Sequence, residues 1–203
     1  MISVATGNLK LGDHIKNLNL LPVVTCVPGV PCAKRQPGKK DPPCYSCKAL
    51  HRPNVKRAWT ANTKLAKSDP VRFFAEMEEE WAWNAPRYFR FFSSGDVPTL
   101  EFLREMVAFI RRHPETRFLV FTKRYGWWNR YSNLPDNLSL VYSAWPGWKM
   151  SNPKCRPVAW MRDPENMDDR IPSDAIECPG LCENCLACWG LAHAGLSVVF
   201  DKH

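Results

Sequence analysis

The chain has 203 residues, 45% of them hydrophobic and 24% charged, an ordinary composition for a soluble globular protein with a real core. Its first 25 residues hold no apolar stretch typical of a signal peptide, and no segment approaches the length of a membrane span, so no membrane partner is expected. Nine cysteines in such a chain favour reduced thiols and metal ligation in the cytoplasm. The net charge of +8 leaves nucleic acid open as a partner.

Residues 26–48 form a cysteine-rich segment in which prolines and glycines leave no room for a helix or a strand. So long an irregular stretch needs something to order it, and a second metal such as zinc would do so. Its ligands would be Cys44 and Cys47 together with Cys26 and Cys32. Two alternatives stay open, because these cysteines could lend ligands to a site elsewhere or be structural thiols that bury like small hydrophobic side chains.

Two helices are predicted next. The first covers residues 54–67, and the second starts at Pro70, with Asp69 as its N-cap, and carries an apolar stripe to about Trp83. Beyond these helices, strands and helices alternate with short connections. In chain order they are strand 87–92, a helix capped by Thr99, strand 117–122, a short helix 124–132, strand 138–143, and weaker strands 158–161 and 196–200.

This alternation is typical of right-handed parallel crossovers. The strands are nearly continuous apolar runs, as expected when both faces of a sheet are covered. No internal repeat and no linker divides the sequence. The pattern therefore predicts one α/β domain over residues 1–203, either a partial barrel or an open, mainly parallel sheet, with irregular cysteine-rich segments at 26–48 and 178–190.

Polar residues follow two of the predicted strands, where parallel α/β folds bind their ligands. Ser94, Gly95 and Asp96 follow the first strand: the glycine lets backbone approach a ligand closely, and the carboxylate can accept from an amine or a hydroxyl. Lys123 follows the second strand and offers charge to a carboxylate or phosphate. These four residues are the candidate cofactor-binding residues. Ordinary turn chemistry is the alternative explanation for both loops.

The last quarter of the chain holds a compact cysteine run, C-x3-C-x2-C-x2-C, made by Cys178, Cys182, Cys185 and Cys188. Cysteines two residues apart rarely reach the geometry of a disulfide without strain, whereas four thiolates within a short loop suit a metal. Zinc sites more often split two C-x2-C pairs across a longer spacer, and compact runs are typical of iron–sulfur clusters. The run therefore predicts at least three ligands of one 4Fe–4S cluster.

Several segments together resemble a phage-encoded family labelled gene product 88: CYSCKALHRPNV, RYFRFFSSGDVPTLEFLREMVAFIRRHPETRFLVFTKR, LPDNLSLVYSAWPG and the terminal cysteine run. The resemblance covers roughly residues 26–190. It implies a fold similar in outline to radical S-adenosylmethionine enzymes, in which residues 94–96 occupy the place of a stretch that contacts the cofactor's amino group. The sequence departs from those enzymes because their cluster motif lies early in the chain, and because Cys188 offers a fourth thiolate.

A cluster closed by four cysteines leaves no iron free to chelate S-adenosylmethionine, so we expect no strong radical cleavage of that compound, without excluding its binding. The leading hypothesis is a phage-type iron–sulfur protein, working in the host cytoplasm with a small molecule or a redox partner; the sequence assigns it no catalytic residue. A metal-stapled nucleic-acid-binding module is the alternative. A non-radical hydrolase using Ser93 or Ser94 ranks last, since no His/Asp partner is assignable. We also expect the loop at 93–96 and the terminal cysteines to border one cleft.

Overall fold

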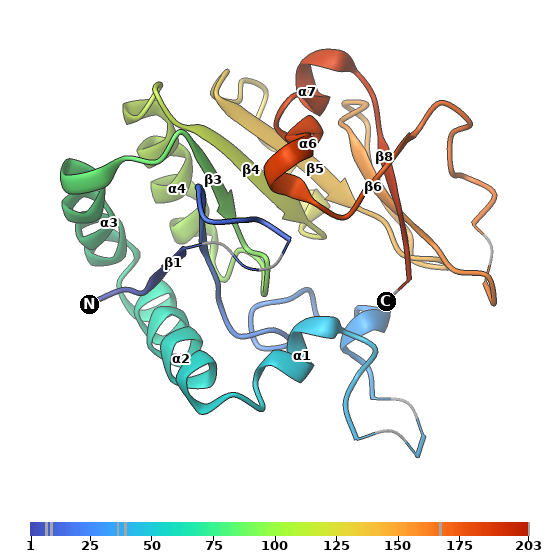
Figure 1. The fold of residues 1–203 in the computed structure, drawn as a ribbon, viewed down its shortest axis with the longest axis horizontal. Helices are drawn as coiled ribbons and strands as arrows, with labels where there is room; N and C mark the ends of the chain where they lie inside the picture. Colours follow the sequence, from blue (N-terminus) through green and yellow to red (C-terminus); the bar gives the residue numbers. More distant parts are fainter. Residues whose placement is uncertain (7, 9, 36, 39, 167, 203) are drawn as a thin grey trace.

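The computed structural model describes all of residues 1–203 except 7, 9, 36, 39, 167 and 203. Its centre is an open eight-stranded sheet in the order β1-β2-β3-β4-β5-β6-β8-β7, in which only β1 runs antiparallel to its neighbour (Figure 1). The strands are β1 Val4–Thr6, β2 Ile15–Leu18, β3 Tyr88–Phe91, β4 Arg117–Thr122, β5 Leu138–Ser143, β6 Val158–Arg162, β7 Ile176–Glu177 and β8 Val198–Asp201. The α/β class and the open, mainly parallel sheet are therefore confirmed.

The amino-terminal strands were not anticipated from the sequence. β2 is the first strand of the parallel set and pairs with β3 in the register Ile15 to Tyr88 and Leu18 to Phe91. Its sequence, IKNL, carries two polar residues and gives neither a continuous apolar run nor a clean alternation. Docking against β3 buries the strand nonetheless, and Asn17 is 1% exposed there. The parallel part of the sheet thus begins about seventy residues earlier in the chain than the sequence pattern indicates.

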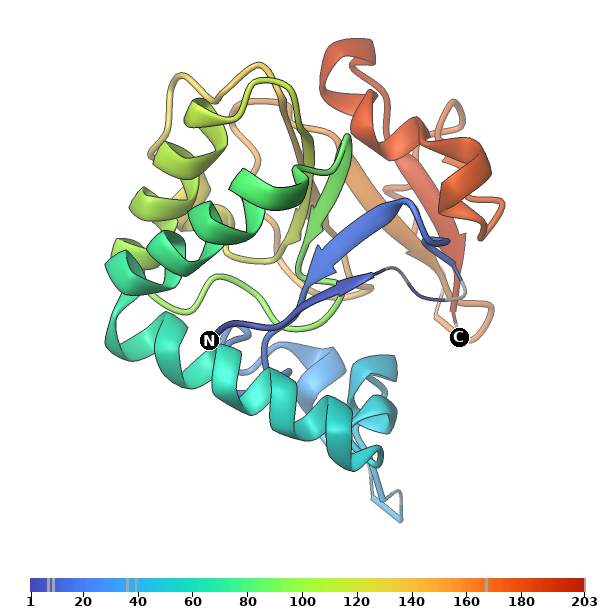
Figure 2. The same ribbon diagram turned by 60° about the vertical axis from the view of Figure 1, so that its left-hand side comes forward.

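Three helices cover one face of the sheet (Figure 2): α2 Pro53–Ser68, α3 Pro70–Asn84 and α4 Leu100–Arg112. The predicted caps are present, because the side chain of Asp69 accepts a hydrogen bond from the Arg72 amide at 2.9 Å and that of Thr99 accepts one from the Phe102 amide at 3.0 Å. The helix predicted over 124–132 is shorter, α5 Tyr125–Trp128. In the described residues, no helix is long and apolar enough to cross a membrane.

The core between these helices and the sheet is mainly aromatic. The ring of Phe74 packs 4.9 Å from that of Phe102, and the indole of Trp81 lies 4.8 Å from the ring of Phe89. Each such buried ring contributes roughly 2–3 kcal/mol through the apolar surface it removes from water. Phe118 also faces this core, whereas the next residue along β4, Leu119, faces the other side of the sheet.

A second, smaller core covers that other side. It is built by the cysteine-rich carboxyl-terminal segment: α6 Cys182–Cys185, a 3-10 turn η2 Ala187–Trp189, and α7 Leu191–Ala194. The Trp189 indole donates to the Phe89 carbonyl at 3.3 Å, and the Ser139 hydroxyl donates to the Cys188 carbonyl at 2.7 Å. The segment is therefore fixed against the early residues of β3 and β5.

The segment at 26–48 is not wholly irregular, so that prediction was wrong. It contains a 3-10 turn, η1 Pro31–Ala33, and the start of a short helix, α1 Tyr45–Ala49. Single turns of this kind form where tertiary contacts hold them, and composition gives little sign of them. Both ribbon views place α1 and its preceding loop at the opposite end of the molecule from α6 and α7.

Candidate functional site

The four terminal cysteines line one pocket, together with Pro179, Leu181, Leu186, Ala187 and Trp189. The empty volume of this pocket is about 230 Å³, counting the part that opens to solvent. Local backbone shapes it: Cys182 and Cys185 bound α6, and Leu186 then takes a left-handed conformation, φ 51°, that turns the chain toward Cys188. The Cys182 amide donates to the Lys10 carbonyl at 2.7 Å, which ties the pocket to the segment before β2.

Arg90 on β3 is the charged residue with the largest effect on the pKa values of two thiols in this pocket, those of Cys182 and Cys188. Burial raises the pKa of the Cys188 thiol to about 12, and the Arg90 guanidinium opposes that shift. The same two causes act in the same order on the raised pKa of Cys182. The guanidinium carbon lies 4.7 Å from the centre of the Phe121 ring. Among the described residues, the buried Arg90 Nε has no hydrogen-bond partner.

Sequence reasoning passed over Arg90 because its strand was taken as a run of aromatics. A signal was present: in RYFRFF the basic residue alternates with Phe89 and Phe91, and so it points to the face opposite the helices. A charged side chain in a central strand, covered on both faces, requires a partner or a function.

Four cysteine thiols line this pocket, which is otherwise apolar. In the described part of the chain, no group of three or more His, Cys, Asp or Glu residues is arranged to hold one metal ion. A lone zinc ion would draw its sulfurs to about 2.3 Å from one point. A cubane cluster instead spreads its four thiolates over separate irons, so its ligands need not converge on one point.

The candidate cofactor residues after β3 all have partners inside the protein. The Ser94 hydroxyl donates to the Leu20 carbonyl at 3.0 Å. Gly95 has φ +82°, and a Cβ there would lie 2.6 Å from the Thr25 Oγ1. The need for glycine therefore comes from the loop after β2, which packs directly against it. Contact with a cofactor stays a prediction for both residues.

Asp96 joins the ends of two strands. Its Oδ1 accepts from the Thr122 hydroxyl and from the Val97 amide, both at 2.8 Å, and its Oδ2 accepts from the Lys123 amide at 2.8 Å. Burial raises the pKa of this carboxyl, while these hydrogen bonds and the nearby Arg124 oppose the shift. Most of the acceptor capacity that we assigned to a cofactor is thus used within the fold.

The two basic residues after β4, Lys123 and Arg124, point in different directions. The Lys123 ammonium donates to the Ser143 hydroxyl at 2.7 Å, at the end of the neighbouring strand β5, and lies 5.9 Å from the Trp145 ring centre. The Arg124 guanidinium instead donates to the carbonyls of Thr25 at 2.8 Å and Cys26 at 3.1 Å. Lys123 is thus placed at a strand end, as predicted, and Arg124 fastens the cysteine-rich loop.

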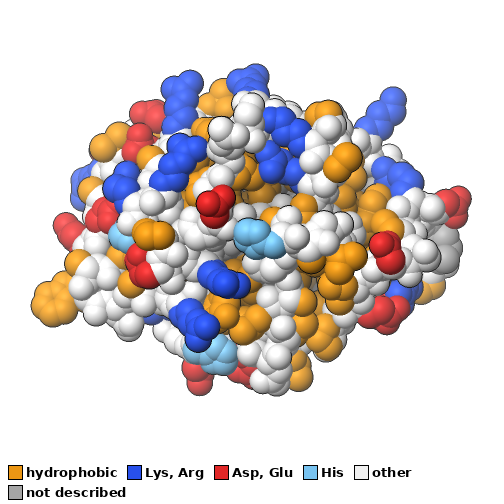
Figure 3. Space-filling model, turned by 90° about the horizontal axis from the view of Figure 1, so that it is seen from above, with side chains coloured by type: hydrophobic (Ala, Val, Ile, Leu, Met, Phe, Trp, Pro, Cys, Tyr) orange, Lys and Arg blue, Asp and Glu red, His pale blue; other side chains and the backbone are white. Residues whose placement is uncertain are grey.

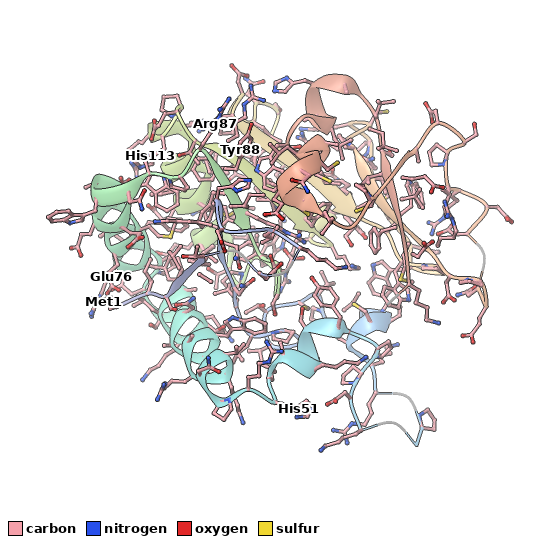
Figure 4. All side chains as sticks on the ribbon, viewed as in Figure 1. Met1, His51, Glu76, Arg87, Tyr88 and His113 are labelled. Atoms are coloured by element: carbon pink, nitrogen blue, oxygen red, sulfur yellow. The ribbon has the colours of Figure 1, made fainter. Side chains whose placement is uncertain are left out.

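The loop at 93–96 and the terminal cysteines do not share a cleft, so that expectation was wrong. The terminal run packs on residues that begin strands, such as Tyr88 and Ser139, whereas residues 93–96 follow the end of β3. In Figure 4, Tyr88 lies toward one end of the molecule and His51, just after α1, lies toward the other. In a parallel sheet all strands start at one end and finish at the other. The terminal run contacts residues at the starts of β3 and β5, and residues 93–96 follow the end of β3, so the two lie at opposite ends of the sheet.

The surface gives no single basic patch on the face that Figure 3 shows. Lys and Arg side chains there are dispersed among acidic and hydrophobic side chains, over the end of the molecule that carries α7. At the other end of the sheet, some cations are paired with carboxylates, as in the Arg162 to Glu177 contact at 2.5 Å and the Lys202 to Asp163 contact at 2.9 Å. This face therefore lacks the continuous positive stripe that nucleic acid needs.

A family model described as Gene product 88 matches residues 4–189. The match spans most of the chain, which therefore belongs to this phage family. The description names no activity or ligand. No curated protein and no solved structure matches the chain.

Proposed function

We propose that this member of the gene product 88 family is an iron–sulfur protein that carries a 4Fe–4S cluster on its four terminal cysteines. The observation that carries the proposal is the pocket itself, in which Cys178, Cys182, Cys185 and Cys188 surround one small, otherwise apolar volume. Iron–sulfur clusters take four cysteine thiolates and are tuned by the burial and charge around them.

The surroundings support a buried anionic group. A cluster with four thiolates is negatively charged, and Arg90 supplies a cation whose Nε has no partner in the described residues. The Trp189 indole walls the pocket at 4% exposure and limits the access of water. Cys188 and Cys182 are neutral thiols at pH 7 without a ligand, because burial raises the pKa of both. Cluster assembly must therefore displace their protons.

A closed cluster of this kind supplies electron transfer and holds its segment in place. Cys178 and Cys185 are exposed, so one edge of the pocket is open to a redox partner. The reducing cytoplasm of the infected host cell is the compartment where such thiolates persist. The sheet, with its strand-end loops, resembles a radical-enzyme scaffold in outline, but the internal partners of Asp96 argue against its use as a cofactor contact.

The test is metal analysis of protein purified without oxygen. We expect a brown protein containing iron and acid-labile sulfide in equal amounts. Cys182→Ser and Cys185→Ser should each bleach the colour and lower the iron content, because each removes one ligand of the cluster. Cys155→Ser is the matched control, since Cys155 is an exposed cysteine outside the pocket, and it should keep full colour.

Two outcomes would oppose the proposal: a colourless, iron-free wild-type protein, or full iron retention in both pocket variants. Incubating the reduced protein with S-adenosylmethionine provides a second test. We expect no 5′-deoxyadenosine above a no-protein control, because four thiolates leave no iron site open. Strong product formation would restore the radical enzyme.

A further inference from the structure

The positive charge of the chain is concentrated in one segment, residues 34–67. This segment holds ten Lys and Arg residues and a single acidic residue, Asp41, which gives it a net charge of +9. The whole chain has a net charge of +8, so the remaining residues are close to neutral. The ten cations are Lys34, Arg35, Lys39, Lys40, Lys48, Arg52, Lys56, Arg57, Lys64 and Lys67. A surface that serves solubility alone mixes both signs of charge, whereas a surface of one sign attracts a partner of the other sign.

The cations of this segment are exposed and are not neutralised within the protein. Nine of the ten lie among the described residues, and all nine are exposed. In the described part of the chain none of the nine makes an ion pair, and the Asp41 carboxylate pairs with His51 instead, at 2.9 Å. The neighbouring helix α3 gives a contrast, because Glu76, Glu78 and Glu80 there pair with cations outside α2. The positive charge of residues 34–67 thus stays available to a partner.

The fold gathers these cations at one end of the molecule. The cations on α2 share one side of the helix, within about 100° of its circumference; they are Lys56, Arg57, Lys64 and Lys67. The buried residues of α2 are centred about 120° away from them. Both ribbon views place α1 and the loop before it beside the start of α2, at the end of the molecule opposite to the one seen in Figure 3.

Tertiary contacts fix the loop and α1 in this position. The Cys44 amide donates to the Cys32 carbonyl at 3.0 Å, which closes the loop that carries the first four cations. Ser46 and Cys47 are the buried residues of α1, and the Ser46 hydroxyl donates to the Ser93 carbonyl at 3.4 Å. The basic segment is therefore a surface supported by the end of β3 and not a free tail.

Two further features suit the backbone of a nucleic acid. Tyr45 is 54% exposed and lies one turn of α1 before Lys48, so its ring can stack on a base beside a cation that contacts a phosphate. The first turn of α2 holds no acidic residue, although acidic residues are favourable there. Instead Arg52 and Lys56 lie four residues apart, and like charges at that spacing repel each other. A polyanion bound at this point relieves the repulsion.

We propose that α1, α2 and the loop at 34–43 bind the phosphate backbone of a nucleic acid without reading its sequence. Lys and Arg side chains neutralise phosphates and displace their counterions, which supplies affinity for any sequence. An anionic membrane is the poorer partner, because helices that insert into membranes carry large apolar residues opposite their cations. The exposed residues of α2 include no large hydrophobic side chain.

The test measures binding of the full-length protein, purified without oxygen, to labelled single-stranded DNA, duplex DNA and RNA of unrelated sequences. Fluorescence anisotropy is followed at several salt concentrations. We expect binding at low salt that weakens steeply as salt rises. The variant Lys56→Gln/Lys64→Gln/Lys67→Gln should bind about tenfold more weakly or worse, and the slope of log affinity against log salt should become less steep by about 3, one unit for each lost phosphate contact.

The matched control removes the same charge from exposed positions outside the segment, Arg104→Gln/Arg130→Gln/Lys149→Gln. It should bind like the unmodified protein. An equal loss in both variants overturns the proposal, because net charge alone would then set the affinity. So does the absence of binding to all three nucleic acids at low salt, or binding only to phosphatidylserine vesicles tested in parallel. Neither variant touches a cysteine, so the iron content of each reports on the terminal pocket separately.

A footprint on the unmodified protein covers the case in which the triple variant fails to fold. Lysine acetylation is mapped by mass spectrometry with and without single-stranded DNA. Lys48, Lys56, Lys64 and Lys67 should be labelled several-fold more slowly in the complex, while Lys149 reacts equally in both states. Protection of Lys149 equal to that of the four segment lysines would place the nucleic acid elsewhere and overturn the proposal.

Discussion

The two cysteine groups reach the same number of thiols by different routes. The terminal set lies within eleven residues, and local turns, among them the left-handed Leu186, bring its members to one pocket. The early set stretches from Cys26 to Cys47, and hydrogen bonds from α1 and to the loop after β2 hold its segment on the ends of β3 and β4. A group of residues brought together by local turns can be predicted from their spacing in the sequence. A group brought together by docking of distant segments can be recognised only in the folded structure. If so, the terminal segment should depend on its core packing and the early segment on the loop that supports it.

The largest effect is expected from Trp189→Ala. This indole is 4% exposed, packs in the smaller core and donates to the Phe89 carbonyl. Removing it should lower the free energy of unfolding by about 3–5 kcal/mol through the cavity it leaves. The measurement is denaturant unfolding, with iron content as a second readout.

Trp83→Ala is the control for that change, because Trp83 is 91% exposed and its loss should stay within about 0.5 kcal/mol. If Trp189→Ala were as mild as the control, local turns alone would hold the terminal segment.

Gly95→Ala tests the docked group. Its Cβ would lie 2.6 Å from the Thr25 Oγ1 and 3.0 Å from the Leu20 carbonyl oxygen, at φ +82°. Strain and overpacking together should cost about 3 kcal/mol of stability and loosen residues 26–48. Limited proteolysis and thermal unfolding measure both effects.

Gly147→Ala isolates the backbone cost, since Gly147 has φ +71° and nothing within 4 Å of the added carbon. It should cost only about 1 kcal/mol. Equal losses at the two glycines would show that the loop after β2 yields, and that the early group tolerates movement of its support.

The sequence predicted the parts of the fold that local physics determines. α3 and α4 begin at their predicted caps, Asp69 and Thr99, and β4 and β5 have the predicted bounds. β2 was missed because its burial depends on β3 rather than on its own pattern. The same holds for the sites: the terminal pocket followed from spacing, but the partners of Gly95 could not be anticipated, since they lie in a loop that packs there only in the folded chain.

Asp96→Asn should cost about 2 kcal/mol. An amide nitrogen in place of Oδ2 would face the Lys123 amide, and a buried donor would lose its acceptor. The pH dependence gives a second readout. Burial raises the pKa of Asp96 above its usual 3.8, so the folded state binds a proton more tightly than the unfolded state in the window just above pH 3.8.

Its contribution to stability is therefore full below that window and declines as pH rises through the raised pKa. Asp96→Asn should flatten this part of the stability curve, followed by urea unfolding at several pH values. A variant with the wild-type pH profile would mean that another group titrates there.

Arg90→Gln should give the smallest effect, and it bears on the terminal group alone. Reduction adds an electron to an anionic cluster, and a nearby guanidinium favours the reduced state. Between partly buried charges several Å apart, loss of the guanidinium changes the free energy of reduction by about 1 kcal/mol, or about 40 mV for a one-electron couple. The potential of the proposed cluster should therefore become more negative by about that amount, with little change in iron content. Arg87→Gln is the matched control, because Arg87 is exposed, lies three residues earlier and rests on the Tyr88 ring. Equal potentials in the two variants would show that Arg90 balances some other charge and that the pocket thiols are tuned by burial alone.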